Sequence, residues 1–183
     1  MVRETLETAT GEVCAVIGQD VYSTDGRPLE QVVGEMLVAR GWWISVAESC
    51  TGGLISSRLT DVPGSSRYVD RGVVTYSNDA KMALLAVPAD LIAAHGAVSE
   101  PVAMAMAGGI CVESGSQVGV GVTGIAGPGG GTPEKPVGTV VVAVITPEVS
   151  RVRTFRFMGE RQLVKFQASQ AALDLVRRLL TVP

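Results

Sequence analysis

The sequence VAESCTGGL at residues 46–54 constrains the fold most, because it joins two kinds of secondary structure through a turn of small residues. Residues 43–47 are mostly apolar and predict the end of a buried strand. Apolar residues then recur at helical spacing, at positions 54, 55, 59 and 62. This spacing predicts a helix that begins near Thr51, so the turn places small polar side chains between a strand and a helix N-terminus.

Ser49 in this turn has two interpretations. Backbone N–H groups at a helix N-terminus are expected to be free, and the helix dipole favours negative charge there. A serine hydroxyl beside such donors is the arrangement of a strand-to-helix elbow that serves acyl transfer. Serine and threonine are also ordinary N-caps, so the turn alone leaves a purely structural role open.

The rest of the chain alternates strands with helices, which predicts a three-layer α/β/α sandwich with a largely parallel sheet. Further β-prone runs lie at residues 68–76, 117–123, 137–145 and 151–157. Helical patterns lie at residues 28–41, 79–85, 88–95, 99–112 and 159–180. The last two strands flank Pro147 and predict an antiparallel hairpin near the C-terminus.

The first 26 residues carry the weakest pattern and are predicted to form an N-terminal extension or connector. Within it, residues 4–17 predict a short helix that is broken at Gly11, and residues 23–26 predict a turn. The folded domain is expected to occupy residues 27–183.

Composition narrows the class of protein. Hydrophobic residues make up 46% of the chain, and the formal net charge is −3 with no basic run, which argues against a nucleic-acid partner. The longest apolar run, at residues 140–145, is far too short to cross a membrane, and no signal peptide is recognisable. Three cysteines without metal-like spacing indicate a reducing compartment and predict no metal site. We therefore expect a cytoplasmic protein without a membrane partner.

Two glycine-rich stretches suggest different things. Residues 119–124 match the G-x-G-x-x-G spelling of a dinucleotide loop, but they lie within a predicted strand and no helix follows. Residues 123–132 form a glycine-dense loop at a strand end, where backbone N–H groups can approach a ligand, often an anion. A ligand-binding loop and a flexible surface loop both remain open for this second stretch.

A serine nucleophile needs a base. His95 is the only histidine, and its place at a predicted helix end is explained by the helix dipole. Cys50 is a rival nucleophile beside Ser49, but the chain has no second histidine to pair with its thiolate.

Lysine is the usual substitute for histidine as the base of a serine nucleophile. Lys81 lies about one turn into the helix that follows Tyr76, so both side chains can project toward the sheet edge that carries Ser49. The pKa of Lys81 would have to fall, through burial or a nearby cation, for it to act near neutrality. A surface lysine on a helix is the other interpretation.

Four long motifs then occur in order, AESCTGG at residues 47–53, GVVTYSNDAK at 72–81, HGAVS at 95–99 and VTGIAGPGG at 122–130. Together they resemble the CinA C-terminal domain family, the nicotinamide mononucleotide deamidases, over residues 29–180. Residues 18–28 resemble the connector that precedes this domain in full-length CinA proteins, and we expect no counterpart of their large N-terminal domain.

The resemblance implies hydrolysis of nicotinamide mononucleotide to nicotinic acid mononucleotide and ammonia, without a metal or another cofactor. It implies Ser49 as nucleophile, Lys81 as its base and Tyr76 as a helper in proton transfer or orientation. Thr123 would lie at the active-site strand end. Further substrate-binding residues are expected in the turn and the glycine loop, namely Cys50, Thr51, Gly52, Gly53, Gly124, Gly127, Gly129 and Gly130.

Arg161 lies in a Gly-Glu-Arg sequence that resembles the Gly-Asp-Arg of the family, and it is implied as a ligand of the substrate phosphate. Lys165 stands where we expect arginine. The resemblance implies a small-molecule nucleotide as the partner and a homodimer as the assembly. Two other functions stay open, a catalytically silent ligand-binding or interaction domain of the same fold and an amidase or esterase that acts on another substrate.

Overall fold

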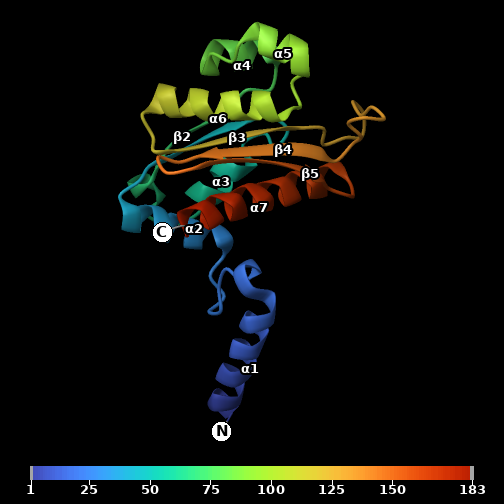
Figure 1. Ribbon diagram of the computed structural model, residues 1–183. Helices are drawn as coiled ribbons and strands as arrows, with labels where there is room; N and C mark the ends of the chain where they lie inside the picture. Colours follow the sequence, from blue (N-terminus) through green and yellow to red (C-terminus); the bar gives the residue numbers. More distant parts are fainter. Residues whose placement is uncertain (1, 182–183) are drawn as a thin grey trace.

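The computed structural model describes residues 2–181, with side chains from residue 4 onward, and a five-stranded sheet forms its centre (Figure 1). The strands are β1 (Ile44–Glu48), β2 (Val69–Val74), β3 (Val118–Gly124), β4 (Thr139–Ile145) and β5 (Ser150–Arg156). Their order is β2-β1-β3-β4-β5. β1 pairs with β2 and β3 in parallel, whereas β4 pairs antiparallel with β3 and β5. The parallel strands and the C-terminal hairpin are therefore both present as predicted.

Helices cover both faces of the sheet (Figure 1). One face carries α4 (Asn78–Leu85), α5 (Ala89–His95) and α6 (Glu100–Ser114). The other carries α2 (Leu29–Arg40), α3 (Leu54–Thr60) and α7 (Arg161–Leu180). Buried aliphatic side chains, mostly valine, leucine and alanine, fill the space between the layers, and almost no aromatic ring takes part. The three-layer α/β/α architecture is confirmed.

The glycines of β3 let α6 approach the sheet closely. A β-carbon at Gly121 would lie 2.3 Å from the Ala103 carbonyl oxygen, and one at Gly119 would lie 2.3 Å from the Ala107 carbonyl oxygen. Both distances are shorter than van der Waals contact, so any larger residue would push the helix away. The dinucleotide-like spelling of residues 119–124 is thus explained by helix–sheet packing.

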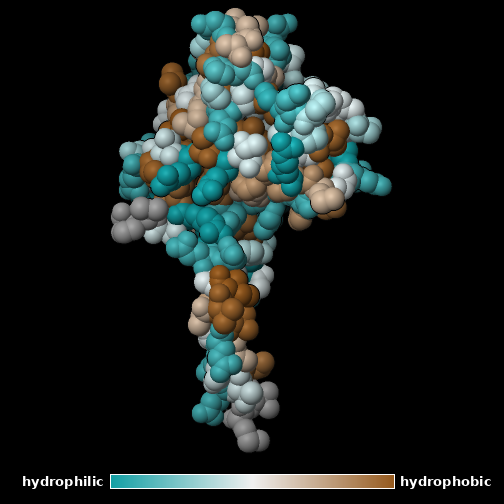
Figure 2. Space-filling view, turned by 45° about the vertical axis from the view of Figure 1, so that its right-hand side comes forward, coloured by the Kyte–Doolittle hydropathy of each residue, from teal (hydrophilic) through white to brown (hydrophobic). Residues whose placement is uncertain are grey.

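The N-terminal helix α1 (Val2–Ile17) projects away from the sheet domain (Figure 1). It runs through Gly11 without interruption, so the predicted break there is wrong. A single glycine lowers helix stability by only about 1 kcal/mol relative to alanine, which neighbouring residues of good propensity can offset. Apolar side chains on this helix are exposed, among them Leu6, Val13 and Val16, and Figure 2 shows the apolar surface that results.

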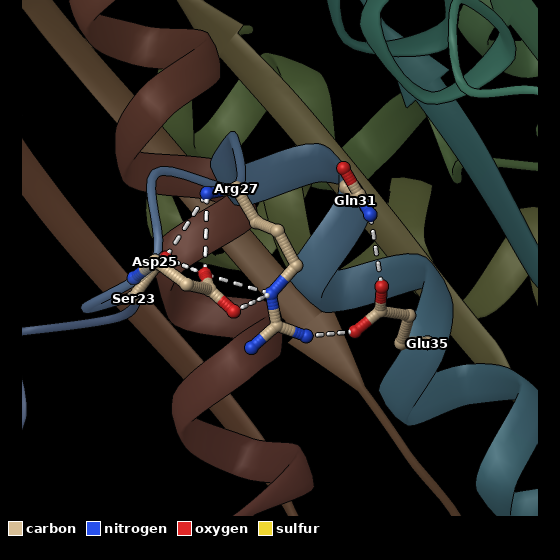
Figure 3. Close-up of polar contacts among 5 residues, drawn as sticks. All are labelled: Ser23, Asp25, Arg27, Gln31 and Glu35. Atoms are coloured by element: carbon tan, nitrogen blue, oxygen red, sulfur yellow. Dashed lines mark hydrogen bonds and ion pairs between the residues drawn. The ribbon is translucent and has the colours of Figure 1, made fainter.

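The segment between α1 and α2 is fixed by polar contacts (Figure 3). The Ser23 hydroxyl donates to Asp25 over 2.6 Å and accepts from the Arg27 backbone N–H over 3.1 Å. The Arg27 guanidinium pairs with Asp25 and with Glu35 of α2, and Gln31 donates to the same Glu35. The ion pairs raise the pKa of Arg27 and lower that of Asp25. Exposed pairs of this kind contribute little stability, but here they define the path of the chain into α2.

The boundary between an N-terminal extension and the folded domain at residues 26 and 27 stays a prediction. Residues on the N-terminal side of it contact helix α7 of the folded domain. Arg177 of α7 donates to the Gln19 carbonyl, and Arg178 pairs with Asp20. Within residues 2–181, no helix has the length and apolar character needed to cross a membrane.

Candidate active site

The turn after β1 places Ser49 at the edge where the three parallel strands end. Helix α3 begins at Leu54, three residues later than predicted. The chain uses those residues to reverse direction, because Gly52 and Gly53 adopt left-handed backbone angles, with φ of 63° and 94°. Glycine is the residue that takes such angles without steric strain. The Gly-Gly pair therefore separates the serine from the helix proper.

Glu48, not a serine or threonine, caps helix α3. Its side chain is fully buried, and Oε2 accepts from the N–H groups of Gly53 and Ile55 over 3.1 Å each. Oε1 accepts from the Ser56 N–H over 2.9 Å and from the Ser56 hydroxyl over 2.7 Å. The prediction that these backbone donors are free is wrong, because a carboxylate from the end of the strand occupies them. An acidic residue suits a helix N-terminus, where the dipole is positive.

The backbone donors nearest to Ser49 are distributed unevenly. The Ser49 N–H donates to the Val122 carbonyl over 2.9 Å, and the Gly52 N–H donates to the Ser49 carbonyl over 3.1 Å. The N–H groups of Cys50 and Thr51 donate no hydrogen bond to an oxygen atom of the described residues. Both act on the Cys50 sulfur, and of the two residues only Cys50 lines the cavity described below, so its N–H is the one nearer to a ligand beside Ser49.

Lys81 reaches Ser49 from helix α4. The Ser77 hydroxyl caps this helix by accepting from the Ala80 N–H over 3.0 Å. The Lys81 side chain is only 1% exposed, and its Nζ lies 3.3 Å from Ser49 Oγ and donates to the Thr75 carbonyl over 2.9 Å. It forms no ion pair with any described residue. Burial therefore lowers the pKa of Lys81 from its ordinary value.

The alternative nucleophile and base are disfavoured by their surroundings. Burial raises the pKa of the Cys50 thiol to about 12, so it carries a proton at neutral pH. His95 ends helix α5, where its carbonyl accepts from the Lys135 amine over 2.9 Å, and it is absent from the lining of the cavity described below. The geometry thus favours a hydroxyl–amine pair.

Tyr76 and Arg161 meet across the mouth of the site. The Arg161 guanidinium donates to the Tyr76 hydroxyl over 3.0 Å and to the Gly127 carbonyl over 2.8 Å. Tyr76 is 62% exposed, and among the described contacts its hydroxyl has no hydrogen bond to Ser49 or Lys81. The arginine therefore ties the phenol to the glycine loop, and a role of Tyr76 in proton transfer stays a prediction.

Thr123 fixes another wall of the site. It is buried at the end of β3, and its hydroxyl donates to the Ala97 carbonyl over 2.9 Å. This bond holds the segment after α5 against the strand end. Ala97 and Val98 line the cavity as a result, although sequence reasoning gave them no role beyond their place in a motif.

A cavity of about 260 Å³ connects these groups. It is lined by ten predicted site residues, namely Ser49, Cys50, Tyr76, Lys81, Thr123, Gly124, Gly127, Gly129, Gly130 and Arg161. Thr51, Gly52 and Gly53 do not line it, so their predicted part in substrate binding stays a prediction. Asn78, Ile125 and Ala126 line it without having been predicted, and the position of Asn78 one turn before Lys81 is the signal that could have identified it. The lining contains no carboxylate, so it favours a neutral or anionic ligand.

The family model for the CinA C-terminal domain matches residues 26–180. The chain belongs to this family. It is 51% identical over 180 residues to a CinA-like protein of Syntrophobacter fumaroxidans, a match that covers 98% of this chain and 42% of the relative. It is 52% identical over 164 residues to a CinA-like protein of Desulfotalea psychrophila, covering 90% of this chain and 40% of that one. The chain thus spans about two fifths of the length of these CinA relatives.

Solved CinA structures share the fold. A CinA superfamily protein from Klebsiella pneumoniae aligns with a TM-score of 0.80 at 34% identity, over 84% of this chain and 98% of that chain. A competence/damage inducible protein from Agrobacterium tumefaciens aligns with a TM-score of 0.79 at 38% identity, over 85% of this chain and 98% of that chain. In the described part of this CinA domain, no three histidine, cysteine, aspartate or glutamate side chains gather where they could hold a metal ion.

Proposed function

We propose that this CinA domain hydrolyses the carboxamide of nicotinamide mononucleotide, giving nicotinic acid mononucleotide and ammonia. The proposal rests above all on one observation, the buried Lys81 amine 3.3 Å from the Ser49 hydroxyl with no carboxylate beside it. Burial lowers the pKa of such a lysine and so favours its neutral form, which is the base that a serine nucleophile requires.

In the first step, Ser49 Oγ attacks the carboxamide carbon while its proton moves to Lys81 Nζ. The negative charge that develops on the carboxamide oxygen would be held by the N–H group of Cys50, which has no oxygen acceptor among the described residues. Lys81 then returns the proton to the departing nitrogen. The C–N bond breaks, ammonia leaves, and an ester joins Ser49 to the nicotinic acid carbonyl.

In the second step, water attacks the ester carbonyl and gives a proton to Lys81. The C–O bond to Ser49 breaks, the proton returns to Ser49 Oγ, and nicotinic acid mononucleotide is released. Lys81 thus carries the proton in both steps and ends each cycle neutral.

The wall of the cavity formed by the glycine loop suits the phosphate of the nucleotide. Arg161 and the residues Gly127, Gly129 and Gly130 line this wall, and an arginine beside a glycine-dense loop is suited to bind phosphate. The carboxylate-free lining is consistent with an anionic substrate. We further propose that the domain works as a cytoplasmic homodimer, a state that sedimentation of the purified protein would test.

The test is ammonia release from nicotinamide mononucleotide, with nicotinic acid mononucleotide identified by chromatography. Wild type should release ammonia, and Ser49→Ala should not while keeping the wild-type circular dichroism spectrum. Release from other carboxamides or esters but not from this nucleotide would reassign the substrate. Absence of turnover on the whole panel, with the nucleotide still bound, would instead indicate a silent binding domain.

A further inference from the structure

Glu48 has an unusual environment for a carboxylate. It is fully buried and forms no ion pair with a described residue, and its two oxygens accept four hydrogen bonds from the turn and first residues of α3. A buried charge is expensive unless such donors compensate it, so this carboxylate has one favoured orientation. The groups of Gly53, Ile55 and Ser56 that donate to this carboxylate are held in place by the same bonds.

The backbone of Glu48 is linked to Lys81 through Thr75. Its carbonyl accepts from the Thr75 N–H over 2.8 Å, and the Thr75 carbonyl accepts from Lys81 Nζ over 2.9 Å. Lys81 Nζ lies 3.3 Å from the hydroxyl of Ser49, which is the next residue after Glu48. A closed ring of contacts therefore joins Glu48, Thr75, Lys81 and Ser49.

We propose that Glu48 is the positioning residue of this site, an inference that rests on the proposed function. Its carboxylate occupies the N–H groups of Gly53, Ile55 and Ser56, and so holds the turn in the conformation that presents Ser49 to Lys81. The same conformation leaves the N–H group of Cys50, a residue that lines the cavity, without an oxygen acceptor among the described residues. Glu48 itself touches no substrate, because it does not line the cavity.

Glu48→Gln tests this role with little change in shape. The glutamine amide nitrogen replaces one acceptor oxygen by a donor, so one side of the group can no longer accept the backbone N–H bonds it now receives. The matched control is Glu30→Gln, because Glu30 is a shielded carboxylate that accepts from Arg58 of the same helix α3, away from the cavity. Both variants are expected to lower stability, but only Glu48→Gln is expected to disturb the pairing of Ser49 with Lys81.

The expected result is a kcat that falls about 100-fold in Glu48→Gln, with KM changed by less than about threefold. Glu30→Gln should keep kcat within about twofold of wild type at a similar loss in melting temperature. A merely structural role would lower kcat in both variants alike or in neither, and either pattern would overturn the proposal.

Labelling of Ser49 by a fluorophosphonate gives a readout that does not depend on the substrate. Wild type that is labelled but releases no ammonia would refute the proposed function alone, and the labelling rates would still decide the role of Glu48. We expect slower labelling of Glu48→Gln than of Glu30→Gln, and equal rates would overturn the inference. Wild type that is neither active nor labelled would overturn both proposals.

If Glu48→Gln does not fold, Ser56→Ala removes only the hydroxyl that donates to Glu48 Oε1 over 2.7 Å. Labelling of Ser49 should then slow several-fold. A Ser56→Ala protein labelled at the wild-type rate would count against Glu48 as the positioning residue.

Discussion

Replacing Lys81 by methionine tests whether the amine is neutral in the folded protein. Methionine keeps a long unbranched side chain in the buried site but removes the contacts to Ser49 and to the Thr75 carbonyl. Each hydrogen bond contributes about 1 kcal/mol, so Lys81→Met should lose about 2 kcal/mol of stability above pH 10.5, where the amine is neutral in both states.

This difference between the two proteins shrinks as the pH falls from 10.5 toward neutral. Burial lowers the pKa of Lys81 in the folded state, whereas the unfolded chain keeps the ordinary value of 10.5. Between the two pKa values, the unfolded state binds a proton that the folded state does not, so wild-type stability falls as the pH falls through this window. Each pH unit within the window removes about 1.4 kcal/mol from the wild type and nothing from Lys81→Met. The variant therefore gains on the wild type as the pH falls from 10.5, until the folded pKa is reached.

Urea denaturation of both proteins between about pH 7 and 10.5 measures this difference. The variant should also lose ammonia release by a factor of about 10² to 10⁴, the range expected for a general base. A stability difference that stays constant over this pH range would mean that Lys81 is protonated in the folded protein. A protonated amine cannot accept the Ser49 proton, and the proposed role of Lys81 as the base of Ser49 would be refuted.

Three further outcomes are expected. The rate of ammonia release should rise with pH through the lowered pKa of Lys81 and be lost below that pKa, since only the neutral amine is a base. A rate that falls with rising pH in this range would contradict the assignment of Lys81 as the base. Arg161→Ala should raise KM for nicotinamide mononucleotide by a factor of about 10 to 100, because a charged hydrogen bond is lost, and should leave KM for nicotinamide riboside nearly unchanged. Equal effects on both substrates would mean that Arg161 does not bind the phosphate. Gly121→Ala should cost about 1 to 3 kcal/mol of stability and lower the melting temperature by about 2 to 4 °C per kcal/mol, because its β-carbon would lie 2.3 Å from the Ala103 carbonyl oxygen. Gly11→Ala is the control, since no atom lies within 4 Å of the added β-carbon, and it should not destabilise the protein.

Much of this fold could be predicted because its signals are local. The strands and helices follow from apolar periodicity, and residues such as Ser77 and Pro147 mark their ends. Two errors in the predicted helices concern glycines. Gly11 does not break α1, and α3 begins at Leu54 rather than near Thr51 because Gly52 and Gly53 form the turn before it.

The contacts of the site depend on groups that are distant in the sequence. The meeting of Lys81 with Ser49 could be expected from the sheet edge to which both belong, but its 3.3 Å geometry follows from the packing of α4. The cap provided by Glu48 could not be read from the pattern, because serine and threonine in the same turn are the more frequent caps. The bond from Arg161 to Tyr76 joins residues 85 positions apart, and nothing in either motif indicates it.

The mixed topology of the sheet explains why the chemistry gathers at one edge. The parallel strands β1, β2 and β3 all end there, and the chain beyond each end supplies Ser49, the segment from Thr75 to Lys81, and Thr123. The antiparallel strand β4 begins at that edge, and its Thr139 carbonyl accepts from the Ile125 N–H over 2.8 Å, which secures the base of the glycine loop. The proposed catalytic groups thus come from strand ends, where side chains can face a cavity, while the hairpin supports the loop that we expect to bind phosphate. A substitution that loosens the hairpin, far from Ser49, should therefore raise KM for the nucleotide more than it lowers kcat.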